Sequence, residues 1–155
     1  MAPSLVVAVV SHAAAGDRAR ALALVDEFDA ATREGPSEYH ELYAPEVVRV
    51  LIAAGETELA ERIVGARPVH VRRTRLAVGS CRALLAEARG DIDEAAAGFR
   101  TAAAGWEAWG GRFEQGHAAA GLGRSLKALG KIGEAALAAN KADSIFTSLG
   151  MPVSA

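Results

Sequence analysis

A glycine followed five residues later by an alanine recurs four times along this chain at a nearly constant period. Successive glycines are separated by 39, 35 and 40 residues. The pairs are Gly16 and Ala21, Gly55 and Ala60, Gly90 and Ala95, and Gly130 and Ala135. Repetition at a period of about 20 to 50 residues is typical of repeat proteins, in which each copy forms one supersecondary unit. The spacing therefore predicts four similar units.

Each unit is expected to be a pair of antiparallel helices joined by a tight turn. A glycine just beyond a helix end takes the left-handed conformation that closes the helix. A polar residue then caps the next helix, and Asp17, Thr57 and Asp91 are the expected caps. Asp91 with Glu94 resembles a capping box. We expect the alanine to lie where the two helices cross closely, so that only a small side chain fits.

The chain is therefore predicted to be all-α. Its 36 alanines among 155 residues favour closely packed helices, and no segment alternates as a half-buried strand does. Connections with Gly35-Pro36 and Arg67-Pro68 separate the first three pairs, because proline cannot continue a helix. The expected helices span about 3–15, 17–33, 39–54, 57–65, 71–89, 91–109, 111–129 and 132–149. They form a single domain, 1–155, with units at about 3–35, 39–66, 71–109 and 111–150.

The second helices of the last two pairs carry matching apolar stripes at helical spacing, which we expect to face the core. The first stripe is Ile92, Ala95, Ala96, Phe99, Ala102, Ala103, Trp106 and Trp109. The second is Ile132, Ala135, Ala136, Ala139, Ala142, Phe146 and Leu149. Gly121 and Gly123 lie inside a helical pattern, so they are expected to serve helix packing rather than phosphate binding.

The helix pairs resemble tetratricopeptide repeats. Those repeats carry a small residue late in the first helix, a glycine at the turn, an alanine in the second helix and an aromatic residue four positions later. The third unit matches at Ala83, Gly90, Ala95 and Phe99, and the fourth at Leu122, Gly123, Gly130 and Ala135. The first two units match more loosely. The resemblance implies an α-solenoid with a right-handed superhelix and a protein-binding function.

That resemblance also implies a binding groove, because the first helix of each pair lines the concave face of such arrays. The candidate partner-binding residues are Arg49, Ser80, Glu87, His117, Arg124 and Lys127. Arg124 and Lys127 make the fourth unit basic, which suits an acidic peptide or a peptide carboxylate. The alternative is that these charges only face water and bind nothing specific.

A narrower resemblance covers the C-terminal half. The segments 84–91, 121–124 and 145–150, together with Phe99, are similar to C-terminal helical regions of large bacterial regulators, namely LuxR-type transcription factors and cyclase-linked ATPases. This likeness implies the alternative function, a regulatory or sensor domain of a larger regulator. The chain carries neither the ATPase module nor the DNA-binding module of those proteins.

The N-terminal helix is apolar on nearly all sides, which is unusual for the exposed end of a repeat array. Its apolar residues include Leu5, Val6, Val9 and Val10. We expect it to form a homodimer contact or to pack against an upstream domain.

Other classes of function are disfavoured by composition and spacing. Seventeen basic and 19 acidic residues give a net charge of −2, so no nucleic acid partner is expected. No apolar span is long enough for a membrane helix. No two of the four histidines have metal-ligand spacing, and Cys81 is expected to be a buried structural residue in a reducing, cytoplasmic compartment. We therefore expect no metal, no cofactor and no enzymatic activity.

Overall fold

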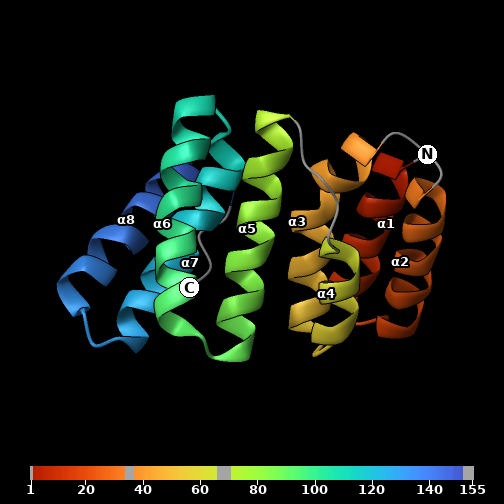
Figure 1. Ribbon diagram of the computed structural model, residues 1–155, viewed down its shortest axis with the longest axis horizontal. Coiled ribbons are helices and arrows are strands. Elements are labelled where there is room, and N and C mark those ends of the chain that lie inside the picture. Colours follow the sequence, from red (N-terminus) through yellow and green to blue (C-terminus); the bar gives the residue numbers. More distant parts are fainter. Residues whose placement is uncertain (1, 34–36, 66–70, 152–155) are drawn as a thin grey trace. The chain divides into compact units, whose positions relative to one another are not determined.

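The described part of the chain is helical and contains no strand (Figure 1). The computed structural model describes residues 2–33, 37–65 and 71–151. Its helices are α1 (Ala2–Ala14), α2 (Arg18–Arg33), α3 (Ser37–Ala53), α4 (Thr57–Val64), α5 (Arg72–Arg89), α6 (Ile92–Trp109), α7 (Arg112–Ala128) and α8 (Ile132–Ser148). The prediction of an all-α chain is confirmed, and each helix begins and ends within two residues of its predicted range. The predicted connections at Gly35-Pro36 and Arg67-Pro68 lie outside the described residues.

The four turns marked by the repeated glycines share one geometry. Gly16, Gly55, Gly90 and Gly130 have φ values of 77°, 79°, 84° and 75°, a region that other residues rarely adopt. At the third turn, the Asp91 N–H donates to the Ala86 carbonyl at 2.9 Å and the Gly90 N–H donates to the Glu87 carbonyl at 3.1 Å. The other three turns repeat both bonds. This is the Schellman arrangement, and it explains why glycine recurs.

The helix starts that follow these turns differ from one another. The Arg20 N–H donates to the Asp17 carboxylate at 3.2 Å, which confirms the predicted cap at Asp17. The predicted cap at Thr57 is wrong, because Glu56 precedes the first helical residue there. Asp91 occupies the predicted cap position of α6, but its carboxylate forms no cap bond and instead accepts from Arg89 Nε at 3.3 Å.

The helices gather in two compact units, Met1–Cys81 and Arg82–Ala155, with α5 crossing from one to the other. In unit 1, α1 packs against α2 and α3, and α3 packs against α4. Ion pairs Arg18–Glu56 (2.6 Å) and Arg62–Asp26 (3.2 Å) also join the second helix pair to α2. The most deeply buried apolar side chains of this unit include Val9, Val25, Phe28, Val47, Val48 and Leu51.

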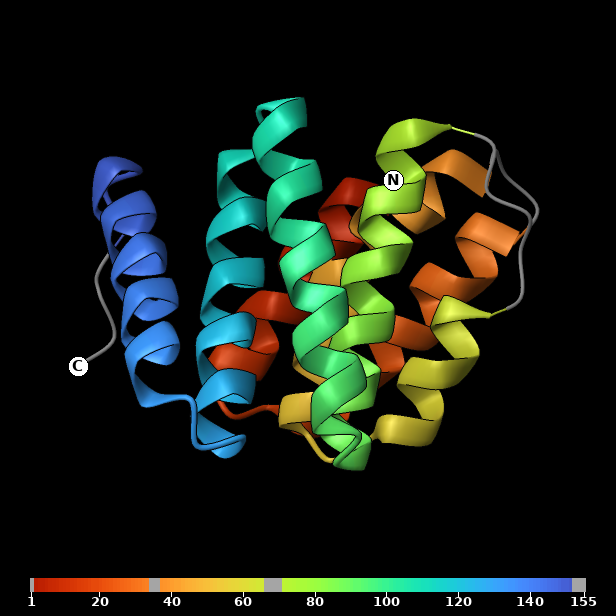
Figure 2. The same ribbon diagram turned by 60° about the vertical axis from the view of Figure 1, so that its left-hand side comes forward.

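In unit 2, α7 packs against both α6 and α8 (Figure 2). Glycines let α7 approach its neighbours closely, as predicted for Gly121 and Gly123. A Cβ atom on Gly121 would lie 2.6 Å from the Phe99 ring of α6, and one on Gly123 would lie 3.3 Å from the Ala135 carbonyl oxygen of α8. Two ion pairs, Arg100–Glu134 (3.6 Å) and Lys141–Glu107 (3.0 Å), join α6 directly to α8.

The alanines of the repeat are buried, as a place at a helix crossing would require. All four alanines are buried, with exposed fractions between 0% and 7%: Ala21, Ala60, Ala95 and Ala135. The position nine residues after each glycine is less uniform, because Val25 and Phe99 are buried whereas Ala139 is exposed. The fourth pair therefore leaves uncovered a position that the third pair buries.

Gly121→Ala is expected to destabilise unit 2 by about 1–3 kcal/mol, because the added methyl group collides with the buried Phe99 ring. This net loss already allows for the gain of about 1 kcal/mol that alanine brings as a better helix former. Urea unfolding followed by circular dichroism measures the difference. The matched control is Gly133→Ala in α8, where nothing lies within 4 Å of the added Cβ and stability should rise by up to about 1 kcal/mol. Equal shifts for the two variants would contradict the packing role of Gly121.

The Glu107 carboxylate is expected to titrate below its ordinary range. Lys141 Nζ donates to both of its oxygens, at 3.1 and 3.0 Å, and this bond and charge lower the pKa of Glu107. A lowered pKa in the folded state stabilises the fold at pH values above the ordinary pKa of Glu107. This contribution is lost as the pH falls through the lowered, folded-state pKa. Lys141→Met should return the pKa of Glu107 toward its ordinary value in an NMR titration, and Lys131→Met should leave it unchanged.

Candidate protein-binding groove

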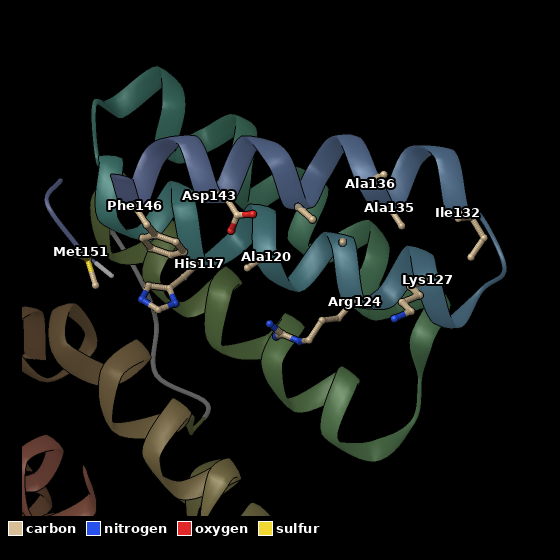
Figure 3. Close-up of a pocket in the computed structure, with 13 residues that line it drawn as sticks. His117, Ala120, Arg124, Lys127, Ile132, Ala135, Ala136, Asp143, Phe146 and Met151 are labelled. Atoms are coloured by element: carbon tan, nitrogen blue, oxygen red, sulfur yellow. The ribbon is translucent and has the colours of Figure 1, made fainter. Parts of the chain in front are cut away.

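A groove with a volume of about 620 Å³ runs between α7 and α8 (Figure 3). We call it the α7–α8 groove. From α7 it is lined by His117, Ala120, Gly123, Arg124 and Lys127, and beyond α8 by Met151. From α8 it is lined by Ile132, Ala135, Ala136, Ala139, Ala142, Asp143 and Phe146. The predicted positions His117, Arg124 and Lys127 therefore lie along one groove, while partner binding there stays a prediction.

The groove has a floor of small side chains. Gly123 lets the backbones of α7 and α8 come together, and Ala135 and Ala142 are buried between them. Ala136 and Ala139 are exposed, as is Ile132 at the end of the groove near Lys127 (Figure 3). An exposed apolar strip of this kind on a protein surface often marks an interaction site.

Aromatic rings form the other end of the groove. The His117 ring meets the Phe113 ring at a centroid distance of 4.6 Å and the Phe146 ring at 5.0 Å, both edge to face. Edge-to-face pairs of this separation are favourable beyond the area they bury. His117 and Phe146 come from α7 and α8, so their contact fixes this end of the groove (Figure 3).

The charge of the groove differs from the prediction. Arg124 Nε and Nη2 donate to the two carboxylate oxygens of Glu87 on α5, each at 2.8 Å. A bidentate pair of this kind is strong, so the Arg124 charge is already matched by a carboxylate. Of the two predicted cations, only Lys127 has no ion pair among the described residues. The predicted basic surface is therefore wrong in extent, because it reduces to one lysine with Asp143 also lining the groove.

The other two predicted groove residues lie in unit 1. Arg49 is paired with Glu46 at 3.3 Å and lines a separate cavity of about 570 Å³ bounded by α1, α2 and α3. Ser80 is buried, and its hydroxyl donates to the Leu76 carbonyl at 3.1 Å. Partner binding at Ser80 stays a prediction, and this residue is only 4% exposed.

The apolar residues of α1 divide between the core and the surface. Val6 and Val9 are buried and Leu5 is half-buried, so the prediction that Val6 and Val9 contact a second chain is wrong. Val7 is 66% exposed and Val10 is 37% exposed. Self-association through α1 stays a prediction, and Val7 and Val10 are the exposed large apolar residues of this helix.

The α8 side of the groove was not predicted as a site. Its stripe was expected to face the core. Ala135 and Ala142 do so, whereas the prediction is wrong for four exposed members of the stripe, Ile132, Ala136, Ala139 and Leu149. The signal in the sequence is the residue nine positions after the turn glycine, which is Phe99 in α6 and Ala139 in α8. The stripe of α8 otherwise matches that of α6, so alanine in place of phenylalanine indicates that this position of α8 has a different packing environment.

The chain matches no protein-family model, and no curated protein or solved structure matches it either. Among residues 2–33, 37–65 and 71–151, no three His, Cys, Asp or Glu side chains cluster as metal ligands do. Within the same residues, every helix is too short or too polar to cross a bilayer.

Proposed function

We propose that this chain is a protein-interaction module, a tetratricopeptide-like α-solenoid of four helix pairs, that binds a helix of a partner protein in the α7–α8 groove. The observation that carries the proposal is a comparison between the third and fourth helix pairs. Gly90 and Gly130 lie in equivalent turns of these pairs, so residues 40 positions apart correspond. The equivalent groove of the third pair is filled by a helix.

That helix is α7. Its Leu122 packs against the core cluster that α5 and α6 form, which consists of Ala83, Ala86, Ala95 and Phe99. Gly121 of α7 faces the Phe99 ring, and Arg124 of α7 forms the ion pair with Glu87. The α5–α6 surface thus holds a helix through a small-residue contact, an apolar contact and an ion pair.

The α7–α8 groove presents the corresponding positions without a helix over them among the described residues. Ala139 corresponds to Phe99 and is exposed, whereas Phe99 is 2% exposed. Covering the apolar residues of the groove removes them from water, which favours association. A helix is the occupant that the repeat supports, because a helix occupies the same place one pair earlier.

Two differences between the grooves define the helix that fits. Ala139 is smaller than Phe99, so the occupant has room for a larger apolar residue where α7 has Gly121. Lys127 corresponds to Glu87, so a carboxylate suits the position where α7 has Arg124. The expected partner helix therefore has one apolar face and an acidic residue three positions beyond its central apolar contact.

A labelled peptide tests the groove. The probe is residues 112–129 of this chain with Gly121→Leu and Arg124→Glu, and fluorescence anisotropy should give a Kd on the order of 10–100 µM, or about −6 kcal/mol. Ala139→Glu in the protein should abolish binding, because it places a charge on the groove floor. Leu137→Glu is the matched control, since Leu137 is 73% exposed on α8 and does not line the groove. Equal effects of the two substitutions would rule out the groove.

A charge exchange tests the orientation of the helix. Lys127→Glu should weaken binding of that peptide by about 3–10-fold, because attraction at an exposed pair becomes repulsion. A second peptide that keeps Arg124 should then bind the Lys127→Glu protein better than it binds the unmodified protein. If neither peptide responds to the charge at position 127, the helix does not lie in the register of α7.

A further inference from the structure

The outward face of α1 matches the face that α7 uses. Counted back from the turn glycine, which is Gly16 in the first pair and Gly130 in the fourth, residues 114 positions apart correspond. Ser4, Val7, Ala8 and Ser11 of α1 correspond to Ala118, Gly121, Leu122 and Ser125 of α7. In α7, Gly121 and Leu122 make the contacts with the preceding pair, and Ala118 and Ser125 are buried.

On α1 the corresponding residues face solvent. Ser4, Val7 and Ser11 are exposed, and Ala8 is partly exposed. Val7 is two-thirds exposed although its neighbours Val6 and Val9 are buried in unit 1. Among the described residues, nothing therefore covers this face of α1 and no helix fills the α7–α8 groove, and the two surfaces occupy corresponding positions of the repeat.

The two surfaces are complementary in size. In unit 2 the large Phe99 of α6 fits against the small Gly121 of α7. In the α7–α8 groove the small Ala139 takes the place of Phe99, and on α1 the larger Val7 takes the place of Gly121. The large residue lies on the groove side in the pair Phe99 and Gly121, and on the helix side in the pair Ala139 and Val7. The summed side-chain volume of the two pairs is therefore similar, as a packed interface requires.

The two surfaces are also compatible in charge. The described face of α1 formed by Ser4, Val7, Ala8 and Ser11 is neutral. Val10 of α1 corresponds to Arg124 of α7, so α1 would place an apolar residue beside Lys127 in place of the carboxylate that suits this position best. A lysine can cover an apolar side chain with its aliphatic stem while its ammonium group stays in water. Arg124 keeps its own partner, Glu87, so docking of α1 leaves no buried charge unmatched.

We propose that α1 of a second copy of this chain docks in the α7–α8 groove. The inference rests on the proposed function, because it names the occupant of the same groove. The contact joins two different surfaces, so each copy offers one helix and one groove. Such head-to-tail contacts add further copies until a ring closes or the chain of copies ends.

The experiment measures the mass of the full chain by light scattering across a concentration series. The unmodified chain should rise above the mass of one copy, 16.0 kDa, as its concentration increases. Val7→Asp blocks only the helix, and Ala139→Asp blocks only the groove, so each variant alone should stay at one copy. An equal mixture of the two should form a dimer and nothing larger, because one intact helix and one intact groove remain.

Circular dichroism and a thermal melt of each variant show that it is folded, which is expected because both positions are exposed. The chain carrying both substitutions should not pair with either single variant. An unmodified chain that keeps the mass of one copy up to about 1 mM overturns the inference. The inference is also overturned if the unmodified chain associates but the mixture of the two variants forms no dimer, because another surface then joins the copies.

Failure of this inference is distinct from failure of the proposed function. If the chain stays at one copy and the labelled peptide still binds in a manner sensitive to Ala139→Glu, the groove serves a different protein and only the second-copy inference is overturned. If the mixture forms no dimer and the peptide does not bind, both are overturned. A dimer in the mixture supports both, because α1 is then a helix bound in the groove.

Discussion

Close approach of helices through glycine and alanine is the contact on which the rest of the structure depends. Alanine buries little apolar area, so a core rich in alanine gains its stability from many short contacts rather than from large side chains. Gly121 against Phe99 and Gly123 against the backbone at Ala135 show how close the helices of unit 2 come. Small side chains also line the floor of the α7–α8 groove, where Ala135, Ala136, Ala139 and Ala142 face a volume of about 620 Å³.

The helices and turns could be predicted because their causes are local. A glycine with positive φ closes a helix through bonds to residues three and five positions earlier, so the signal and the structure lie in the same few residues. The caps were less predictable than the turns. Glu56, not Thr57, occupies the cap position of α4, and the Asp91 carboxylate accepts from Arg89 in place of a backbone N–H at the helix start.

The candidate site could be predicted only on its α7 side. Repeat position placed His117, Arg124 and Lys127 on one face, but the bond from Arg124 to Glu87 joins residues 37 positions apart and has no local signal. The unbroken apolar run of α1 has no period that separates faces, so it could not tell buried Val6 and Val9 from exposed Val7. The α8 side required comparison of two copies of the repeat, because its signal is the difference between Phe99 and Ala139.

The match between the α5–α6 and α7–α8 surfaces also bears on how such a chain can change in length. A duplication that added one more copy of about 40 residues after α8 would present its first helix to the α7–α8 groove and would expose a new groove beyond it. A copy of α7 would need changes opposite Ala139 and Lys127, the two positions at which this groove differs from the α5–α6 surface. The α7–α8 groove would then be the surface at which evolution adds a repeat. A helix docked there from another chain would occupy the same place, but reversibly.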